Sequence, residues 1–115
     1  MTPCKPGDVV LLPFPFTDLT TTKQRPAVVI SSEAFNAQRP DVIVLAITSQ
    51  IPPTLNAEDY RLSSEEQRAA GLPKPSLIKI GKLLTIDQRL IRKHLGRFPT
   101  STVAQITQRL VAILG

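Results

Sequence analysis

Residues 7–31 read GDVVLLPFPFTDLTTTKQRPAVVIS, and this stretch decides the fold. Two apolar runs rich in valine and leucine flank a polar, threonine-rich loop, which is the pattern of two neighbouring strands. The second run begins at Ala27, directly after Arg25 and Pro26. We therefore expect strands over residues 9–14 and 27–31, with Arg25 at the junction between the loop and the second strand.

Three later segments are candidates for further strands. The apolar run at 42–47 is long enough for a strand that is buried on both faces but too short for a helix. Residues 76–84 alternate well enough for another strand. The segment 86–97 fits either a turn of helix or a final strand that ends at Gly96. These segments favour a fold built mainly from strands.

Helix-capping residues predict short helices and one longer helix. Ser32 can cap a helical turn over residues 33–35, and residues 63–70 carry a Ser-x-x-Glu capping pattern followed by glycine. Thr100 or Ser101 can cap a C-terminal helix with apolar residues on one stripe: Val103, Ile106, Leu110, Val111 and Leu114. We expect a mainly β fold with short helices: a small barrel-like sheet with a C-terminal α-helix that closes the core.

The composition limits the class of protein. The chain has 115 residues, 42% hydrophobic and 20% charged, which suits one domain over residues 1–115. No apolar run approaches the roughly 20 residues of a membrane helix, and prolines interrupt the start before a signal peptide could form. We therefore expect a cytoplasmic protein with no membrane partner. Because a domain of this size buries only about two thirds of the surface that its unfolded chain exposes, dimerisation would help its stability.

Cysteine and histidine each occur once, as Cys4 and His94. One cysteine cannot form an internal disulfide, and this pair offers no metal-ligand set of recognisable spacing. We expect neither a metal site nor a cofactor. An imidazole can serve in acid–base chemistry, but a lone histidine in a basic turn is more often simply exposed.

Positive charge is concentrated in the second half of the chain. The formal net charge is +5, and seven basic residues between 74 and 97 stand against Asp87 alone. For any one of them a solvated surface is the more common explanation, but together they suggest a polyanionic partner. The seven are Lys74, Lys79, Lys82, Arg89, Arg92, Lys93 and Arg97.

An ordered set of sequence blocks resembles the PemK/MazF family of type II toxin–antitoxin systems. The blocks are GDVVLLPFPFTD, KQRPAVVIS, LAITSQI, GLPKPSLIK, TIDQRLI and LGRF, and they span nearly the whole chain. The resemblance implies an SH3-like barrel, shared with CcdB, that forms a homodimer. It also implies a growth-arresting endoribonuclease that cleaves single-stranded RNA without a metal ion. A cognate antitoxin with an acidic tail would inhibit the enzyme and join it in a DNA-binding complex.

The resemblance places the family's catalytic residues on Arg25 and Thr48. RNA cleavage by the 2′-hydroxyl group gathers negative charge on the non-bridging phosphate oxygens. Arg25 can donate two parallel hydrogen bonds to that phosphate, and the Thr48 hydroxyl can add a third. Arginine seldom gives up its proton, so the proton-transfer group is unassigned. Without the resemblance, Arg25 would be interpreted as a surface residue and Thr48 as the cap of a turn.

Nine further residues are candidates for contact with RNA. Phe16 could stack on an unpaired base or pack as a lid on the barrel. Lys82 stands where many family members carry a polar amide, so the resemblance does not determine which bases this chain prefers. The candidates are Phe16, Thr17, Lys23, Gln24, Ser49, Gln50, Ser76, Lys79 and Lys82.

Two other functions fit the same barrel. A CcdB-like gyrase poison acts by binding a topoisomerase and uses a tryptophan near its C-terminus, whereas this chain has no tryptophan. A catalytically silent homologue would bind the antitoxin and serve only as a co-regulator. The presence of both Arg25 and Thr48 favours the ribonuclease.

Overall fold

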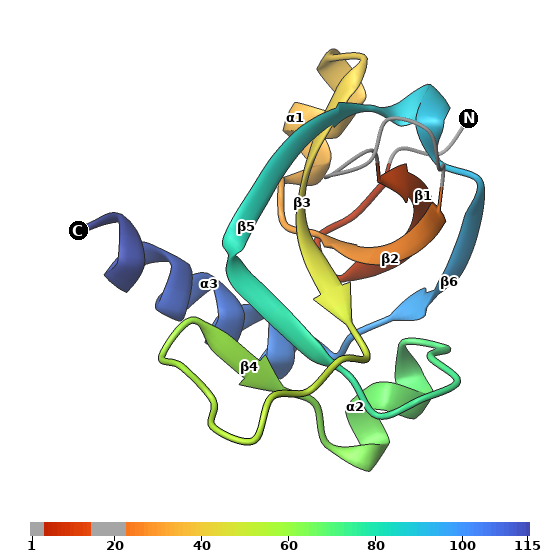
Figure 1. Cartoon of the computed structure of the whole chain (residues 1–115). Helices are drawn as coiled ribbons and strands as arrows, with labels where there is room; N and C mark the ends of the chain where they lie inside the picture. Colours follow the sequence, from red (N-terminus) through yellow and green to blue (C-terminus); the bar gives the residue numbers. More distant parts are fainter. Residues whose placement is uncertain (1–3, 15–22) are drawn as a thin grey trace.

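The structure is a computed structural model that describes residues 4–14 and 23–115 (Figure 1). In the described part, the chain forms six strands, three α-helices and a 3-10 helix, η1. Their bounds are β1 Asp8–Phe14, β2 Lys23–Val29, α1 Glu33–Gln38, β3 Asp41–Thr48, β4 Asp59–Arg61, α2 Ser64–Ala69, β5 Leu77–Asp87, η1 Gln88–Leu90, β6 Lys93–Arg97 and α3 Thr100–Leu114.

All six strands belong to one antiparallel sheet with the order β4-β5-β3-β2-β1-β6. Figure 1 shows the sheet curling around a shared interior, while α3 packs against β5. The mainly β fold with a C-terminal helix is therefore confirmed. The barrel is open, because β4 and β6 form the two ends of the strand order and no ladder among the described residues joins them.

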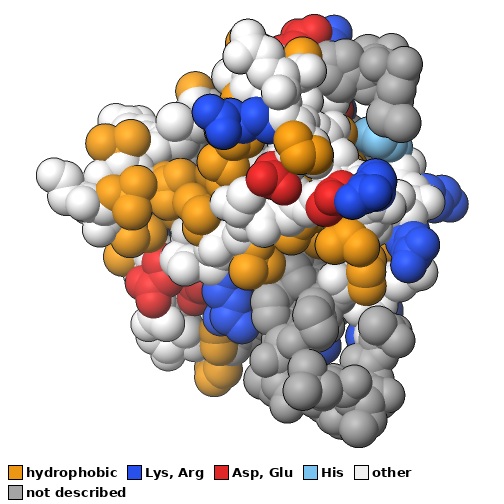
Figure 2. Space-filling view, turned by 90° about the horizontal axis from the view of Figure 1, so that it is seen from above, with side chains coloured by type: hydrophobic (Ala, Val, Ile, Leu, Met, Phe, Trp, Pro, Cys, Tyr) orange, Lys and Arg blue, Asp and Glu red, His pale blue; other side chains and the backbone are white. Residues whose placement is uncertain are grey.

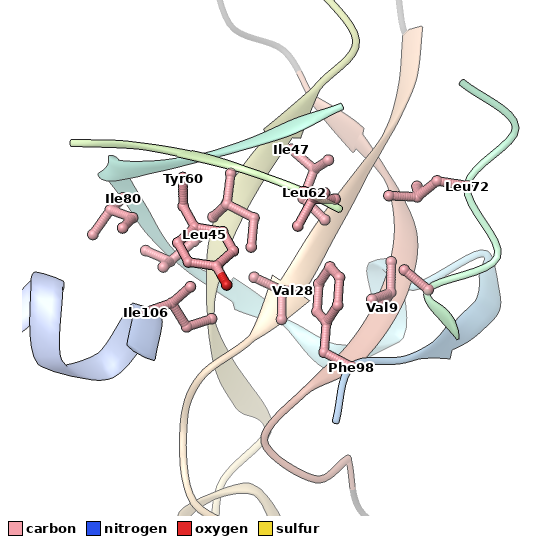
Figure 3. Packing of buried hydrophobic residues seen from close by; sticks show 12 residues of the cluster. Val9, Val28, Leu45, Ile47, Tyr60, Leu62, Leu72, Ile80, Phe98 and Ile106 are labelled. Carbon is pink, nitrogen blue, oxygen red and sulfur yellow. The ribbon is translucent and has the colours of Figure 1, made fainter. Parts of the chain in front are cut away.

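Both faces of the central strands are buried, which explains their continuous apolar runs. Successive side chains of a strand point to opposite faces, so neighbouring residues of β1 enter different clusters. The first core contains Val9, Val28, Leu45, Ile47, Tyr60, Leu62, Ala70, Leu72, Ile78, Ile80, Phe98 and Ile106. The second core contains Cys4, Val10, Leu12, Ala27, Val29, Val42, Val44 and Ala46. Figure 3 shows Val9, Val28 and Phe98 converging in the first core.

Strand β2 begins earlier than the sequence predicts. The polar residues before Ala27 are paired with β1, and Arg25 lies opposite Leu12 in that ladder. The prediction that Arg25 lies at a loop–strand junction is therefore wrong, because long-range pairing with β1 overrides the weak strand preference of Lys23–Gln24–Arg25. The backbone of Arg25 is held within a strand.

Other strand predictions differ mainly in length. β3 occurs as expected, whereas β5 continues to Asp87. The ambiguous segment 86–97 contains both predicted alternatives, since η1 is followed by β6, which ends at Arg97. β4 was not predicted, because its three residues are too few to show an alternating pattern.

The predicted caps of the two short helices are present. The Ser32 side chain accepts a hydrogen bond from the Phe35 N–H at 3.1 Å. Ser63 and Glu66 form a full capping box, in which each side chain accepts a hydrogen bond from the other's backbone N–H. Gly71 has a φ of +71°, a conformation that ends α2 and favours glycine.

The predicted cap of α3 is wrong. Thr100 and Ser101 already lie inside the helix, and its N-cap, Pro99, has no side-chain cap. Ile106 is buried in the first core, and Val103 and Leu110 pack against it. Val111 and Leu114 are 61% and 74% exposed, so the last turn of the predicted stripe extends beyond the core. In the described residues, no helix is long and apolar enough to cross a membrane.

A polar network joins α2, β4 and α3. Tyr60 and Thr102 both donate hydrogen bonds to Glu66 Oε2, at 2.7 and 2.6 Å. Burial alone would raise the pKa of Glu66, but hydrogen bonds from Ser63, Thr102 and Tyr60 outweigh it and lower that pKa. Burial and the bond to Glu66 raise the pKa of Tyr60 to about 12. The network therefore holds Glu66 ionised and Tyr60 protonated.

Candidate functional site

A cavity of about 510 Å³ lies where β2 begins and β3 ends. Its walls come from segments that are far apart in the sequence, namely β1, β2, β3, the loop before β5, and β6. The lining residues are Leu11, Lys23, Gln24, Arg25, Pro26, Ile47, Thr48, Ser49, Gln50, Gly71, Leu72, Pro73, Lys74, Ser76 and Leu95. We call this space the Arg25 cavity.

Arg25 and Thr48 are brought together by the register of β2 and β3. The ladder between these strands pairs Ala27 with Ala46. This ladder ends there, and Arg25 and Thr48 each lie two residues beyond it, which is where the same register, if continued, would place them opposite one another. Because side chains alternate along a strand, both belong to the sheet face of Ala27 and Ala46. Both are half-buried and line the Arg25 cavity.

The Thr48 hydroxyl has a structural partner. Its oxygen accepts a hydrogen bond from the backbone N–H of Gln50 at 3.1 Å, which is the turn-capping contact expected of a threonine at a strand end. A hydroxyl also carries one donor, and this contact leaves that donor unused. The turn therefore fixes the position of the oxygen while the proton stays able to reach a ligand in the cavity.

The charge of the cavity wall is positive. Lys23, Arg25 and Lys74 all line it, and no carboxylate is present among the described residues that do so. Such a concentration of cations in a recess attracts anionic ligands, and a guanidinium group can bind phosphate through two parallel hydrogen bonds. The wall is suited to a phosphate-bearing ligand.

Apolar side chains form another part of the wall. Leu11, Ile47, Leu72 and Leu95 lie beside the polar residues. A mixture of apolar contact and hydrogen-bonding groups is how proteins hold unstacked RNA bases. The Arg25 cavity can therefore accommodate a base next to a phosphate.

On one side of the cavity, the backbone of the loop after α2 packs directly against the backbone of β6. A Cβ atom on Gly71 would lie only 2.1 Å from the carbonyl oxygen of Leu95. Since both residues line the cavity, a side chain at position 71 would push this wall outward.

The structure brings five of the nine RNA-contact candidates to the Arg25 cavity, namely Lys23, Gln24, Ser49, Gln50 and Ser76. Ser76 is buried, and its hydroxyl donates to the carbonyl oxygen of Lys74 at 2.9 Å, so its proton serves the loop. Lys79 and Lys82 lie along β5 and are not among the lining residues. Phe16 and Thr17 lie outside the described residues.

Sequence reasoning missed Lys74 and the apolar wall as parts of the site. Lys74 was noted only for its charge, although it stands between two prolines in the same GLPKPS block that supplied Ser76. Prolines restrict the loop backbone, and that signal could have identified Lys74. The apolar residues gave no such signal, because they are indistinguishable in sequence from core residues.

His94 lies elsewhere. It is exposed, as predicted for a lone histidine, and it lines a second cavity that shares no residue with the Arg25 cavity. Its Nε2 atom lies 3.9 Å from Cys4 Sγ. In the described structure, His94 is therefore not placed to transfer protons at the Arg25 cavity.

Similar folds occur among solved toxin structures. An endoribonuclease in complex with its cognate antitoxin from a mycobacterial species matches with a TM-score of 0.79 at 16% identity, over 97% of this chain and 95% of that one. MazF from Deinococcus radiodurans matches with a TM-score of 0.77 at 21% identity, over 98% and 97%. A MazE–MazF structure from the same organism gives 0.76 at 21% identity, over 98% and 96%. At these identities the likeness establishes the fold.

Family membership rests on the sequence itself. No match was found among curated proteins. The family model described as PemK-like, MazF-like toxin of type II toxin–antitoxin system matches residues 5–114, which include the strands of the sheet and both Arg25 and Thr48. The chain belongs to the PemK-like, MazF-like toxins of type II toxin–antitoxin systems.

Proposed function

We propose that this toxin is an endoribonuclease that cleaves single-stranded RNA without a metal ion, and that Arg25 and Thr48 act on the scissile phosphate. The observation that carries the proposal is their meeting at one end of β2 and β3, in a cavity walled by cations. The similar mycobacterial structures are described as endoribonucleases, which supports the same activity.

The reaction proposed is attack by the ribose 2′-hydroxyl oxygen on the adjacent phosphorus. The bond to the 5′ oxygen of the next nucleotide breaks, leaving a 2′,3′-cyclic phosphate and a free 5′-hydroxyl end. Negative charge on the two non-bridging oxygens grows in the transition state. The Arg25 guanidinium meets this charge with two hydrogen bonds and the Thr48 hydroxyl with one, and donors of this kind lower a barrier by about 3 kcal/mol each.

The remaining wall would hold the RNA on either side of the scissile phosphate. Lys23 and Lys74 are placed to contact neighbouring phosphates, while Gln24, Ser49 and Gln50 offer hydrogen bonds to sugars or base edges. The apolar side of the cavity would receive a base. Among the described lining residues there is no histidine, carboxylate, cysteine or tyrosine, so we assign to this wall binding and charge stabilisation and leave proton transfer unassigned.

The cationic wall of the Arg25 cavity also suggests how an inhibitor of the toxin would bind. We propose that a cognate antitoxin inhibits the enzyme by placing an acidic tail against the cationic wall, and that the toxin works as a cytoplasmic homodimer. The solved MazE–MazF structure supports the antitoxin partner. A complex with the antitoxin on DNA and growth arrest by free toxin belong to this proposal, as does a single domain over residues 1–115.

The test is an RNA cleavage assay with analysis of the product ends. Purified toxin is incubated with a panel of single-stranded RNAs in the presence of a chelator. We expect cleavage at a limited set of sequences, with cyclic phosphate and 5′-hydroxyl ends. Folded protein that leaves the whole panel intact would overturn the proposal. Plasmid supercoiling assayed in parallel reports the gyrase-poison alternative, and antitoxin binding without either activity reports the silent co-regulator.

A further inference from the structure

Three potential metal ligands lie close together near the pairing of β1 with β6. Cys4 precedes β1, Asp8 begins it, and His94 lies on β6, which pairs with β1. The Cys4 sulfur, an Asp8 carboxylate oxygen and a His94 ring nitrogen all lie within 4.8 Å of one another. The sequence expectation of no metal site rested on spacing along the chain, and the fold removes that separation.

We propose that Cys4, Asp8 and His94 form a binding site for a thiophilic divalent cation such as Zn²⁺, with water as the fourth ligand. In a tetrahedral zinc site with bonds of about 2.3 Å to sulfur and 2.0–2.1 Å to nitrogen, those two ligand atoms are separated by about 3.6 Å. Cys4 Sγ and His94 Nε2 are 3.9 Å apart. The sulfur and the nitrogen therefore need to approach each other only slightly, and the Asp8 oxygen must close in from within 4.8 Å.

The charges of the three ligands match a divalent ion. A thiolate and a carboxylate together carry two negative charges and the imidazole is neutral, so the three ligands balance a divalent ion, and Arg97, which is paired with Asp8, adds one positive charge beside them. This balance matters because Arg92 and Lys93 are close by. Sulfur and nitrogen ligands select Zn²⁺ or similar ions over Mg²⁺ and Ca²⁺, which prefer oxygen.

Neighbouring groups hold two of the ligands in place. Asp8 is buried, and its oxygens accept hydrogen bonds from Arg97 Nε at 2.7 Å and from the Lys5 N–H at 2.9 Å. The Cys4 carbonyl oxygen accepts a hydrogen bond from the buried Asn36 side chain at 2.7 Å. Each Asp8 oxygen retains a second lone pair for a metal. Such outer contacts orient ligands in metal sites.

The site is reached through a second cavity of about 390 Å³. Cys4 and His94 both line it, together with Gln88, Arg89, Ile91, Arg92 and Lys93. Figure 2 shows the single histidine side chain on the same side of the molecule as several lysine and arginine side chains. The thiol and the imidazole therefore border the same cavity, whereas Asp8 is not among the residues that line it.

A role for Cys4 as a reactive nucleophile is less favoured. Burial, reinforced by the nearby Asp8 carboxylate, raises the pKa of the Cys4 thiol. A thiol that keeps its proton is a poor nucleophile. A bound cation can displace that proton because thiolate is the form that ligates metal.

The test is titration of tag-free, full-length toxin with Co²⁺, which reports thiolate ligation by a near-ultraviolet charge-transfer band. Cys4 is the only cysteine and His94 the only histidine, so the signals are assigned without ambiguity. We expect one Co²⁺ per chain with visible bands of a tetrahedral site, competed away by Zn²⁺. Cys4→Ser should abolish the charge-transfer band, and His94→Gln should weaken Co²⁺ binding roughly tenfold or more, since even the loss of an outer contact to a ligand costs about that much.

Lys93→Ala is the matched control, because Lys93 lines the same cavity but is no ligand in this site. It should retain the band. If Cys4→Ser fails to fold, alkylation of the wild-type thiol replaces it, and Zn²⁺ should slow that alkylation while a chelator restores it. Absence of the band and of this protection, or unchanged affinity in His94→Gln, would overturn the site. RNA cleavage plays no part in these readouts.

Discussion

Arg25 and Thr48 line the same cavity from neighbouring antiparallel strands, each two residues beyond the paired Ala27 and Ala46. Pairing with β1 and β5 holds the two backbones in the sheet, and both side chains line the Arg25 cavity, which opens where the β2–β3 ladder ends. A guanidinium and a hydroxyl fixed in this way need little reorganisation to meet charge that develops on a phosphate.

Two substitutions of Arg25 distinguish the effect of its charge from the effect of its paired hydrogen-bond donors. Arg25→Ala should lower the single-turnover cleavage rate by about 10²–10³-fold, because a transition-state donor is lost. Arg25→Lys keeps the charge but not the paired donors, so most of that loss should remain. The half-buried side chain is not part of either core, and the melting temperature should hardly change.

Arg89→Ala is the control for Arg25→Ala. Arg89 is exposed, forms an ion pair with Asp87 at 2.9 Å and does not line the Arg25 cavity. Its replacement should leave cleavage intact. If Arg25→Ala instead unfolds the protein, Arg25 is structural and its assignment to the phosphate is wrong.

Thr48 is tested by keeping or removing its hydroxyl. Thr48→Val preserves the shape and strand preference of the side chain but cannot donate, so cleavage should fall by about 10²-fold or more. Thr48→Ser keeps a hydroxyl that can accept from Gln50 and donate to a phosphate, and it should restore most of the rate. Single-turnover rates measure both effects. Equal activity of the valine and serine variants would limit the hydroxyl to its turn-capping contact.

The sequence predicted the main strands and the short helix caps because these depend on local patterns. The sequence placed Arg25 at a junction between loop and strand because strand propensity is a local property. The start of β2 depends instead on pairing with β1. The same limit explains why the end of α3 was predicted to be buried, since periodicity does not show where a core ends.

Candidate site residues could be predicted only where they belong to a sequence block that resembles the family. Arg25, Thr48 and five of the other candidates came from these blocks and line one cavity, while their roles stay predictions. Cys4 and His94 are separated by 90 positions, and only the pairing of β1 with β6 brings their segments together. No spacing rule within a single sequence encodes that contact.

Lys74 should contribute to RNA binding through charge. Each phosphate contact by a lysine contributes about 0.7 to the slope of log affinity against log salt for single strands. Lys74→Ala should therefore weaken binding at low salt for all RNA sequences and reduce the slope by about that amount. Equilibrium binding to uncleavable RNA across a salt series measures it. Lys93→Ala, outside the Arg25 cavity, should leave the slope unchanged, and a shared decrease would indicate a nonspecific effect of net charge.

Glu66 should make the free energy of unfolding depend on pH in the acidic range. Hydrogen bonds from Ser63, Thr102 and Tyr60 lower its pKa from the usual 4.5 despite the opposing effect of burial. The ionised carboxylate therefore stabilises the fold above pH 4.5, and this contribution is lost as the pH falls through the lower, folded-state pKa. Glu66→Gln should reduce the free energy of unfolding at neutral pH by about 1–2 kcal/mol, because charge-assisted hydrogen bonds become neutral ones.

Urea unfolding at a series of pH values measures this contribution. The free energy of unfolding of Glu66→Gln should be lower than that of the wild type at pH 7, and the difference should shrink below pH 4.5. Glu65→Gln is the matched control, since Glu65 also lies in the first turn of α2 but is exposed. The two glutamates share the helix N-terminus, so any effect of the helix dipole appears in both variants. A difference between Glu66→Gln and wild type that stays constant with pH would show that Glu66 acts through packing instead of its charge.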